Sequence, residues 1–466
     1  MAKIQQTDKA PALSLGQLIA AAQKSGRDLS DVIIAEACEI TGQSRGEVLE
    51  ALGSVFAHNL RALELGISTG ESMLLGRCAF DLAKDGFRHK IFNDVFVNKA
   101  LVYTLGAQVG NHSIGLEPCA GTGDSCSYTG MYRAIGEEYG YDAALKAAAI
   151  MLKIGTIFRI GKTTTGCNME GLGAGAAAGA AALTALWGGS PEQAGKAVVL
   201  ALSATIAVPC TPRVMVPGLC VTHIGGAVLL SVLAAKVILS TDIPVNVPVD
   251  VMIALAADAH KISAKHVVPS LIRYLQPYFK TNDYVERYVD AAVKIREAET
   301  MHVSTEAAME EAARLAADAN PITKPFGEAV VGGSSQAVGS PTNAGRIAHA
   351  LAHGEIRSVK IELYPELFAR RGINVPGILM GAVYGAGTDD YVMYENIMDK
   401  VLTSNLKVEV LEIDTPQTQR VTIETDEGIF MVDTSNRGGG RLKINDALPS
   451  LQAAKEAAIL LRIVEA

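Results

Sequence analysis

The sequence predicts a mostly α domain followed by a smaller α+β domain, and three observations support this fold class. Apolar residues recur at spacings of three and four through the first part of the chain, which is typical of amphipathic helices. Later segments alternate apolar and polar residues, as half-buried strands do. Hydrophobic residues make up 49% of the chain but aromatic residues only 5%, and 45 glycines favour closely packed helices over a large β-sandwich. Pro321 and Pro325 punctuate the change, so we expect domains at residues 1–320 and 321–466.

The first segments of the chain are expected to form helices. Residues 14–26 and 28–42 show helical apolar spacing and end in glycine, which commonly terminates a helix. Residues 44–66 begin with Ser44 three positions before Glu47, the pattern of a capping box. We therefore expect one long helix over this third segment.

Three glycine- and proline-rich loops interrupt the helical region. They span residues 115–126, 161–171 and 208–226, and the third reads "VPCTPRVMVPGLCVTHIGG" between two apolar segments. Proline lacks an N–H donor and clashes with the preceding turn, so such a loop breaks a helix. An alanine-rich helix is expected after the second loop. Helices then continue to the domain boundary, with one connection marked by Pro244 and Pro248.

The second domain is expected to have a β-α-β-α-β-β order and a mostly antiparallel sheet. Helical spacing predicts helices at residues 340–354 and 389–404. Alternation of apolar and polar residues predicts strands at residues 356–364, 406–413, 419–425 and 428–433.

Composition and charge exclude several classes of protein. The net charge is −8 without a basic cluster, so no nucleic-acid partner is expected. Residues 1–16 carry no apolar run behind their lysines, so we expect no signal peptide, and seven cysteines then fit a reducing, cytoplasmic location. The most apolar run, residues 224–239, is interrupted by Lys236 and is interpreted as a core helix. No membrane span is therefore expected.

The cysteines fall into two groups. Cys38 and Cys78 lie in helix-like segments and are expected to be small buried hydrophobes. The other five lie in or beside the loops, where glycine lets a thiolate approach a metal and proline stiffens the backbone. Their spacing matches neither a ferredoxin nor a zinc ribbon, so spacing alone leaves metal ligands and unliganded cysteines both open. These five are Cys119, Cys126, Cys167, Cys210 and Cys220.

The helical part of the chain resembles the iron–sulfur-dependent L-serine dehydratases. The segment "LEPCAGTGDSCSYTG" is similar to that family's Pro-Thr-Ala-Gly-Ser loop, and "GCNMEGLGAGAAAGAAALTALWGG" to its Gly-Gly-Cys-Gln-x-Glu segment. The proline-cysteine loop is similar to the family's Cys-Asp-Pro loop, which ends in a second Pro-Cys. The resemblance implies that Cys167, Cys210 and Cys220 ligate a [4Fe–4S] cluster whose fourth iron stays open to substrate.

The second domain resembles the β-part of the same family, an ACT-like domain. The segments "VVGGSSQAVGSPTNAGRIAHAL", "VKIELYPELFARRG" and "TSNRGGGRLKIN" carry this resemblance. The chain departs from the family where Gln336 replaces one motif histidine and Ile373 another, and it ends without a cysteine. The cluster loops are intact, but the family's substrate, serine, is left open.

The resemblance implies a deaminating β-elimination in amino-acid metabolism and gluconeogenesis. The substrate would be L-serine or a related small β-substituted amino or hydroxy acid, and the products a keto acid and ammonia. An open iron can stabilise the leaving hydroxide, and a base must take the α-proton. The candidate bases are Lys162, Glu170 and His223. Lys162 also suits carboxylate binding, Glu170 the loop amides, and His223 a satisfied core position.

Two groups of residues are candidates for holding the substrate. The loop residues Gly121, Thr122, Gly123 and Ser125 offer N–H groups and hydroxyls ahead of a helix, which suits a carboxylate, although such loops also serve as plain turns. In the second domain, Ser334 and Ser335 either complete the pocket or cap the following helix.

Three other functions remain open at this stage. The same cluster would suit a cysteine desulfidase-type elimination. A non-catalytic ligand-binding or sensor homologue is an alternative from another class, and a small-residue-rich membrane protein is a third. We expect a small-molecule substrate and, from base rates, a homodimer.

Overall fold

The computed structural model describes residues 12–72, 75–87, 90–114, 126–160, 172–206, 219–275, 283–317, 336–436 and 441–463. The chain divides into two compact units, Met1–Ala312 and Ala313–Ala466. The first is helical and the second combines helices with a five-stranded sheet, so the predicted order of a mostly α domain and a smaller α+β domain is confirmed. The division falls inside the helix Ala291–Ala317, ahead of Pro321.

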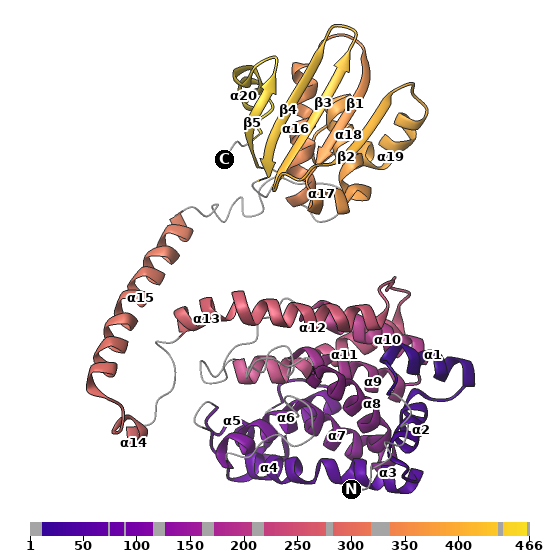
Figure 1. Ribbon diagram of the computed structural model, residues 1–466, viewed down its shortest axis with the longest axis vertical. Coiled ribbons are helices and arrows are strands. Elements are labelled where there is room, and N and C mark those ends of the chain that lie inside the picture. The colour runs from indigo at the N-terminus through magenta and orange to yellow at the C-terminus, as the bar shows by residue number, and fades with distance from the viewer. Residues whose placement is uncertain are drawn as a thin grey trace, which may run out of the picture. The chain divides into compact units, whose positions relative to one another are not determined.

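The first unit is helical, and its helices α1 to α12 pack together as a bundle (Figure 1). Its helices are α1 (Leu15–Ser25), α2 (Leu29–Thr41), α3 (Arg45–Val55), α4 (Ala57–Ser68), α5 (Cys78–Phe87), α6 (Val95–Ile114), α7 (Cys126–Tyr139), α8 (Tyr141–Ile160), α9 (Gly175–Leu186), α10 (Pro191–Ser203), η2 (Leu219–Ile224), α11 (Gly225–Ser240), α12 (Val249–His266), α13 (Val268–Leu275), α14 (Asp283–Glu286) and α15 (Ala291–Ala317).

Local sequence motifs cap the N-termini of several of these helices. Ser14 and Ser44 each form a capping box, as the sequence predicted for Ser44. Ser190 forms a third, followed by Pro191 at the first helical position, where its missing N–H costs nothing. A tertiary contact adds to the first cap, because Asp250 of α12 accepts hydrogen bonds from Ser14 Oγ at 2.6 Å and from the Gly16 N–H at 2.9 Å.

The expected single helix over residues 44–66 is wrong in one respect. The chain forms α3 and α4, which meet at Phe56 with φ −86° and ψ −9°. The Phe56 ring is fully buried and stacks on Tyr132 of α7, with ring centroids 4.4 Å apart. This contact joins residues far apart in the sequence, so no local pattern could reveal it.

Helix α9 lies inside the bundle and shows what the small residues do (Figure 1). Every residue from Gly175 to Thr184 is buried, against α8, α10 and α11. Ser231 of α11 donates a hydrogen bond to the Ala176 carbonyl at 3.1 Å, a contact that requires the two backbones to lie close together. The expectation of closely packed helices with small-residue contacts is confirmed.

One helix among the described residues is long and apolar enough to cross a membrane, Val221–Ser240. Its most apolar window is 44% buried in the protein, and its Gly225, Ala227 and Ser231 lie in the core. Lys236 holds its ammonium 4.3 Å from the centre of the Trp187 ring. These contacts pack one face of the helix against its neighbours in the first unit.

The second unit contains a five-stranded sheet with helices packed on it (Figure 1). The sheet order is β2-β1-β3-β4-β5, with β1 and β2 parallel and the remaining pairs antiparallel. Helix α16 packs on β3 and β4, and α18 packs on α16 and β1. The elements are α16 (Gln336–Leu351), β1 (Ile356–Leu363), α17 (Pro365–Ala369), α18 (Arg371–Tyr384), α19 (Tyr391–Leu402), β2 (Lys407–Glu412), β3 (Thr418–Thr425), β4 (Ile429–Asn436), β5 (Leu442–Leu448) and α20 (Leu451–Leu460).

The four predicted strands and the mostly antiparallel sheet are confirmed, but the predicted β-α-β-α-β-β order is wrong. The described order is α-β-α-α-α-β-β-β-β-α. The helix predicted at residues 340–354 precedes the first strand, whereas the predicted order began with a strand, and the sequence analysis missed α17, α18, β5 and α20. Helix α18 contains Pro376, which disfavours a helix interior, and tertiary packing of the helix overrides this local signal.

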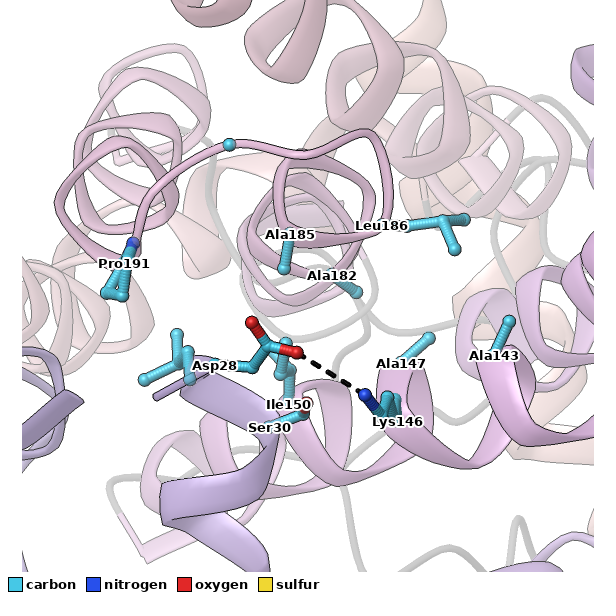
Figure 2. Close-up of a pocket in the computed structure, with 12 residues that line it drawn as sticks. Asp28, Ser30, Ala143, Lys146, Ala147, Ile150, Ala182, Ala185, Leu186 and Pro191 are labelled. Carbon is cyan, nitrogen blue, oxygen red and sulfur yellow. Dashed lines mark hydrogen bonds and ion pairs between the residues drawn. The ribbon is translucent and has the colours of Figure 1, made fainter. Parts of the chain in front are cut away.

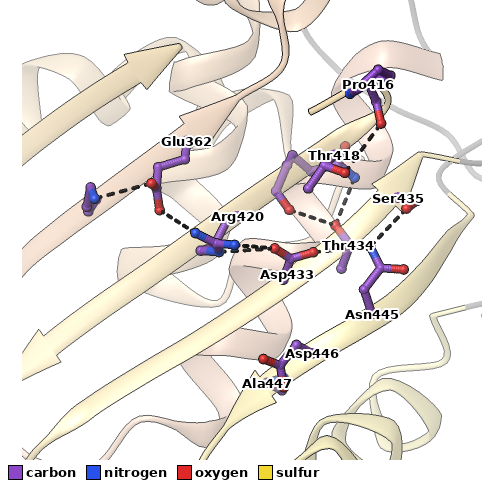
Figure 3. Close-up of polar contacts among 12 residues, drawn as sticks. Glu362, Pro416, Thr418, Arg420, Asp433, Thr434, Ser435, Asn445, Asp446 and Ala447 are labelled. Carbon is purple, nitrogen blue, oxygen red and sulfur yellow. Dashed lines mark hydrogen bonds and ion pairs between the residues drawn. The ribbon is translucent and has the colours of Figure 1, made fainter. Parts of the chain in front are cut away.

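A polar network crosses the three central strands (Figure 3). Arg420 on β3 donates to Asp433 Oδ2 on β4 from Nε at 3.0 Å and from Nη2 at 2.8 Å. Its Nη1 lies 3.5 Å from Glu362 Oε2 on β1. Asp433 also accepts a hydrogen bond from Asn445 of β5 at 3.1 Å. The two nearly buried carboxylates are thus paired with one guanidinium.

The crossing of α4 and α6 gives a stability prediction. A β-carbon at Gly110 would overlap the Ala62 carbonyl oxygen and lie 2.9 Å from Ala62 Cα. Because backbone atoms cannot move aside as a flexible side chain can, Gly110→Ala is expected to lower the free energy of unfolding by about 1–3 kcal/mol or more. Thermal unfolding followed by circular dichroism measures the change.

The matched control is Gly46→Ala in the exposed start of α3, where a β-carbon meets only Ser44 Oγ at 4.0 Å. This control should be neutral or stabilising by up to about 1 kcal/mol. Equal stability of the Gly110→Ala protein and the wild type would contradict the close crossing.

Candidate functional site

Most of the predicted site residues lie outside the described residues. These are Lys162, Glu170, Cys167, Cys210, Gly121, Thr122, Gly123, Ser125, Ser334 and Ser335. Cys220 lies in η2, where the structure describes the backbone and not the cysteine side chain. Among the predicted site residues, His223 is the one whose side chain is described.

The described elements on either side of the three loops nevertheless define where the loops end. The loop before Cys126 leads into α7, and residues 161–171 lead into α9. Residues 207–218 lead into η2 and α11. Residues 172–174 and Leu219–Ile224 both form π-helical turns, a wide-turn geometry that is frequent at functional sites.

The first turns of these three helices touch one another. A β-carbon at Gly175, the first residue of α9, would lie 2.6 Å from Ser127 Oγ of α7 and 3.2 Å from the Ala227 β-carbon of α11. A β-carbon at Gly226 would lie 3.5 Å from Leu172 Cδ1. The three loops that carry the predicted cluster cysteines and the glycine-rich motif are therefore followed by helices that contact one another near their first turns.

The ends of these helices give the site a positive electrostatic character. The N-terminus of a helix carries unpaired backbone N–H groups and a partial positive charge of about half an elementary unit. Helix α7 begins directly after its loop, whereas α9 and α11 continue the π-helical turns that begin at residues 172 and 219, so the N-termini of these two segments lie at the turns. Such N-termini favour an anion nearby, such as a thiolate-ligated cluster or a carboxylate. The arrangement is therefore suited to negatively charged groups.

Two further polar residues at the helix ends were missed by the sequence analysis. Asn111, three residues before the end of α6, is 7% exposed and donates from Nδ2 to Cys126 Sγ at 3.2 Å. Asn111 Oδ1 and Ser127 Oγ are buried and have no hydrogen-bond partner among the residues that the structure describes. In the sequence each is a polar residue within a helical segment. Only the positions of the neighbouring helices show that these polar atoms are buried.

His223 in η2 also has a buried polar atom. Its Nδ1 is buried and lacks a hydrogen-bond partner within the described part of the chain. Burial disfavours the charged imidazolium and so lowers the pKa of His223 below its ordinary value of 6.5. The imidazole is therefore neutral at pH 7 and can accept a proton. Leaving a buried polar atom unpaired costs about 1–3 kcal/mol, so this nitrogen requires a partner from the loops or from a bound molecule.

No protein-family model matches the sequence, and no curated protein matches it. Within the described residues, no three His, Cys, Asp or Glu side chains gather as a metal site. Two of the three predicted cluster cysteines lie outside those residues.

The contact at Gly175 gives a prediction that can be tested with a double-mutant cycle. Gly175→Ala places a methyl group against Ser127 Oγ and should destabilise the protein by about 1–3 kcal/mol. Ser127→Ala removes that oxygen, and its own effect on stability is measured separately in the cycle. The double variant should recover part of the loss, with a coupling energy of about 0.5–3 kcal/mol in chemical denaturation.

The control is Gly226→Ala, which meets only Leu172 at an ordinary contact distance of 3.5 Å and should be tolerated. Strict additivity of the Gly175 and Ser127 substitutions would contradict the contact between the two helix starts.

Proposed function

We propose that this protein is a [4Fe–4S]-dependent ammonia-lyase. It would act on L-serine or a related small β-substituted amino or hydroxy acid and release a keto acid and ammonia. Cys167, Cys210 and Cys220 would hold the cluster. The observation that carries the proposal is the mutual contact of the helix starts that follow the three loops.

The described residues fit a cluster in charge and in polarity. A cluster with three thiolate ligands is anionic in most of its states, and three helix starts favour an anion. Asn111 Oδ1, Ser127 Oγ and His223 Nδ1 are buried without a partner among the described residues. Such atoms support a bound polar group at the loop ends, because buried polar groups in proteins are nearly always paired.

The bound cluster would supply a Lewis acid for the leaving hydroxide. The chain's own residues would do the remaining work. His223, neutral because of its burial, can take the α-proton at a ring nitrogen, and Lys162 and Glu170 remain candidates for the same role or for binding the carboxylate. Gly121, Thr122, Gly123 and Ser125 would bind the substrate carboxylate ahead of α7.

The substrate could also be a β-thiol amino acid. Gln336 begins α16 where the family has a histidine motif, and Ile373 lies in α18 at the second such position. The Ile373 carbonyl accepts a hydrogen bond from Tyr394 Oη at 3.0 Å, so this segment has a structural role here. A cysteine desulfidase-type elimination is therefore retained as an alternative reaction at the same cluster.

One observation favours a second candidate function, a ligand-binding or sensor role for an ACT-like second unit. Gln419 is fully buried, and its Nε2 donates to Ser340 Oγ at 2.9 Å and to Thr434 Oγ1 at 2.8 Å. Gln419 Oε1 has no partner among the described residues. Ser334 and Ser335 immediately precede the helix that carries Ser340. A colourless protein that binds L-serine through this unit would favour the second function over the lyase.

We also propose a substrate class, a cellular location and an oligomeric state. The proposal includes a small-molecule substrate, a cytoplasmic location and a homodimer. Cys38 and Cys78 form no disulfide among the described residues, which suits a reducing compartment, and the homodimer is proposed because it is the commonest assembly of soluble proteins.

Anaerobic purification tests the lyase. The wild-type protein should be brown, contain about four irons and four sulfides per chain, and bleach in air. Cys167→Ser, Cys210→Ser and Cys220→Ser should each lose iron and keto-acid release. The matched control is Cys38→Ser in the partly buried part of α2, which should keep both. Full turnover by an iron-free protein would overturn the proposal.

The role of His223 predicts a pH dependence. A base must be neutral, so kcat/KM should fall as pH drops through the pKa of His223, which burial holds below 6.5. His223→Gln should lower kcat by about 100-fold or more and remove this acidic limb. His302→Gln, at an exposed position of α15, is the control and should leave the profile unchanged. An unaltered acidic limb in His223→Gln would exclude His223 as the base.

A further inference from the structure

A pocket lies among α2, α8, α9 and the start of α10 (Figure 2). Its volume is about 250 Å³. It is lined by the first half of α8 and the last residues of α9, whereas residues 161–171 join the other ends of these two helices. The pocket is therefore separate from the candidate site at the loop ends.

The pocket has an apolar wall and a charged edge. Ile150, Ala182 and Leu186 contribute to the wall. At the edge, Lys146 Nζ lies 3.3 Å from Asp28 Oδ2, and the two side chains are 46% and 71% exposed (Figure 2). An ion pair this exposed contributes little stability, so a ligand that engages both charges loses little by separating them.

A buried hydroxyl and an uncapped helix start add two hydrogen-bonding features. Ser30 in the first turn of α2 is 4% exposed and lines the pocket. Asp28 occupies the N-cap position of α2, but its side chain makes no capping hydrogen bond. The first N–H groups of α2 therefore have no side-chain cap, which suits a carboxylate.

We propose that this pocket binds a small α-amino acid with an apolar side chain. The ligand's carboxylate would bind Lys146 and the Ser30 hydroxyl at the start of α2, and its ammonium would bind Asp28. Its side chain would cover the apolar wall. A pocket of this modest volume suits a ligand smaller than a typical drug-sized molecule, with a few polar groups fixing its orientation.

Isothermal titration calorimetry of the full-length protein tests the proposal with L-leucine as the probe. Leucine has no β-leaving group, so turnover cannot contribute to the signal. 4-Methylpentanoate lacks the ammonium and leucinamide lacks the carboxylate. Each should bind about tenfold or more weakly than leucine, the loss expected for one charge-assisted hydrogen bond.

Variants locate the site. Lys146→Met should weaken leucine binding about tenfold or more, and Ala185→Leu, which fills a partly buried part of the lining, should abolish it. The matched control is Lys196→Met, which removes a similarly exposed lysine paired with Glu192 on α10 and should bind as the wild type does. Cys167→Ser should retain binding, which separates this site from the proposed cluster.

Absence of leucine binding to the wild type would overturn the proposal. Equal binding by the wild type and Lys146→Met would do so as well, and this comparison remains decisive if Ala185→Leu does not fold. Equal affinity for leucine and leucinamide would show that the carboxylate is not recognised.

Discussion

The close contact of three helix starts at Gly175 is the constraint on which the proposed site depends. Because Gly175 has no side chain, the first turn of α9 can touch Ser127 of α7 and Ala227 of α11 at once. The loops that precede these helices are far apart in the sequence, and the contact brings the helices that follow them together. A β-carbon at this position would press against Ser127 Oγ at 2.6 Å and the Ala227 β-carbon at 3.2 Å, so the close contact requires glycine or a compensating change at Ser127.

Close packing of helices through small residues also buries polar atoms near the site. Helices that approach this closely leave little room for water, so Asn111, Ser127 and His223 have buried polar atoms at the loop ends. Burial keeps His223 neutral, while the helix starts favour negative charge nearby. In the proposed reaction, a neutral His223 would take the proton, and the N-termini of the helices would favour the substrate carboxylate. The pocket at Lys146 uses the opposite ends of α8 and α9.

The sequence predicted what local signals encode. The capping box at Ser44 and the alternating strands of the second unit are local, and both are present. The break at Phe56 and the helix around Pro376 depend on tertiary packing, and the sequence analysis missed them. Cysteine spacing alone left metal ligands and unliganded cysteines both open. The predicted ligand set came from the resemblance to a family. Asn111 and Ser127 could not be found at all, since a polar residue in a helix is significant only when its buried position is known.

Mössbauer spectroscopy of air-free protein enriched in ⁵⁷Fe tests the central claim most directly. The account predicts a cubane cluster in which one iron subsite differs from the other three, and addition of L-serine or another true substrate should shift that subsite alone. A cluster whose irons all remain unchanged with every active substrate, or a spectrum without iron–sulfur signals from active protein, would contradict it.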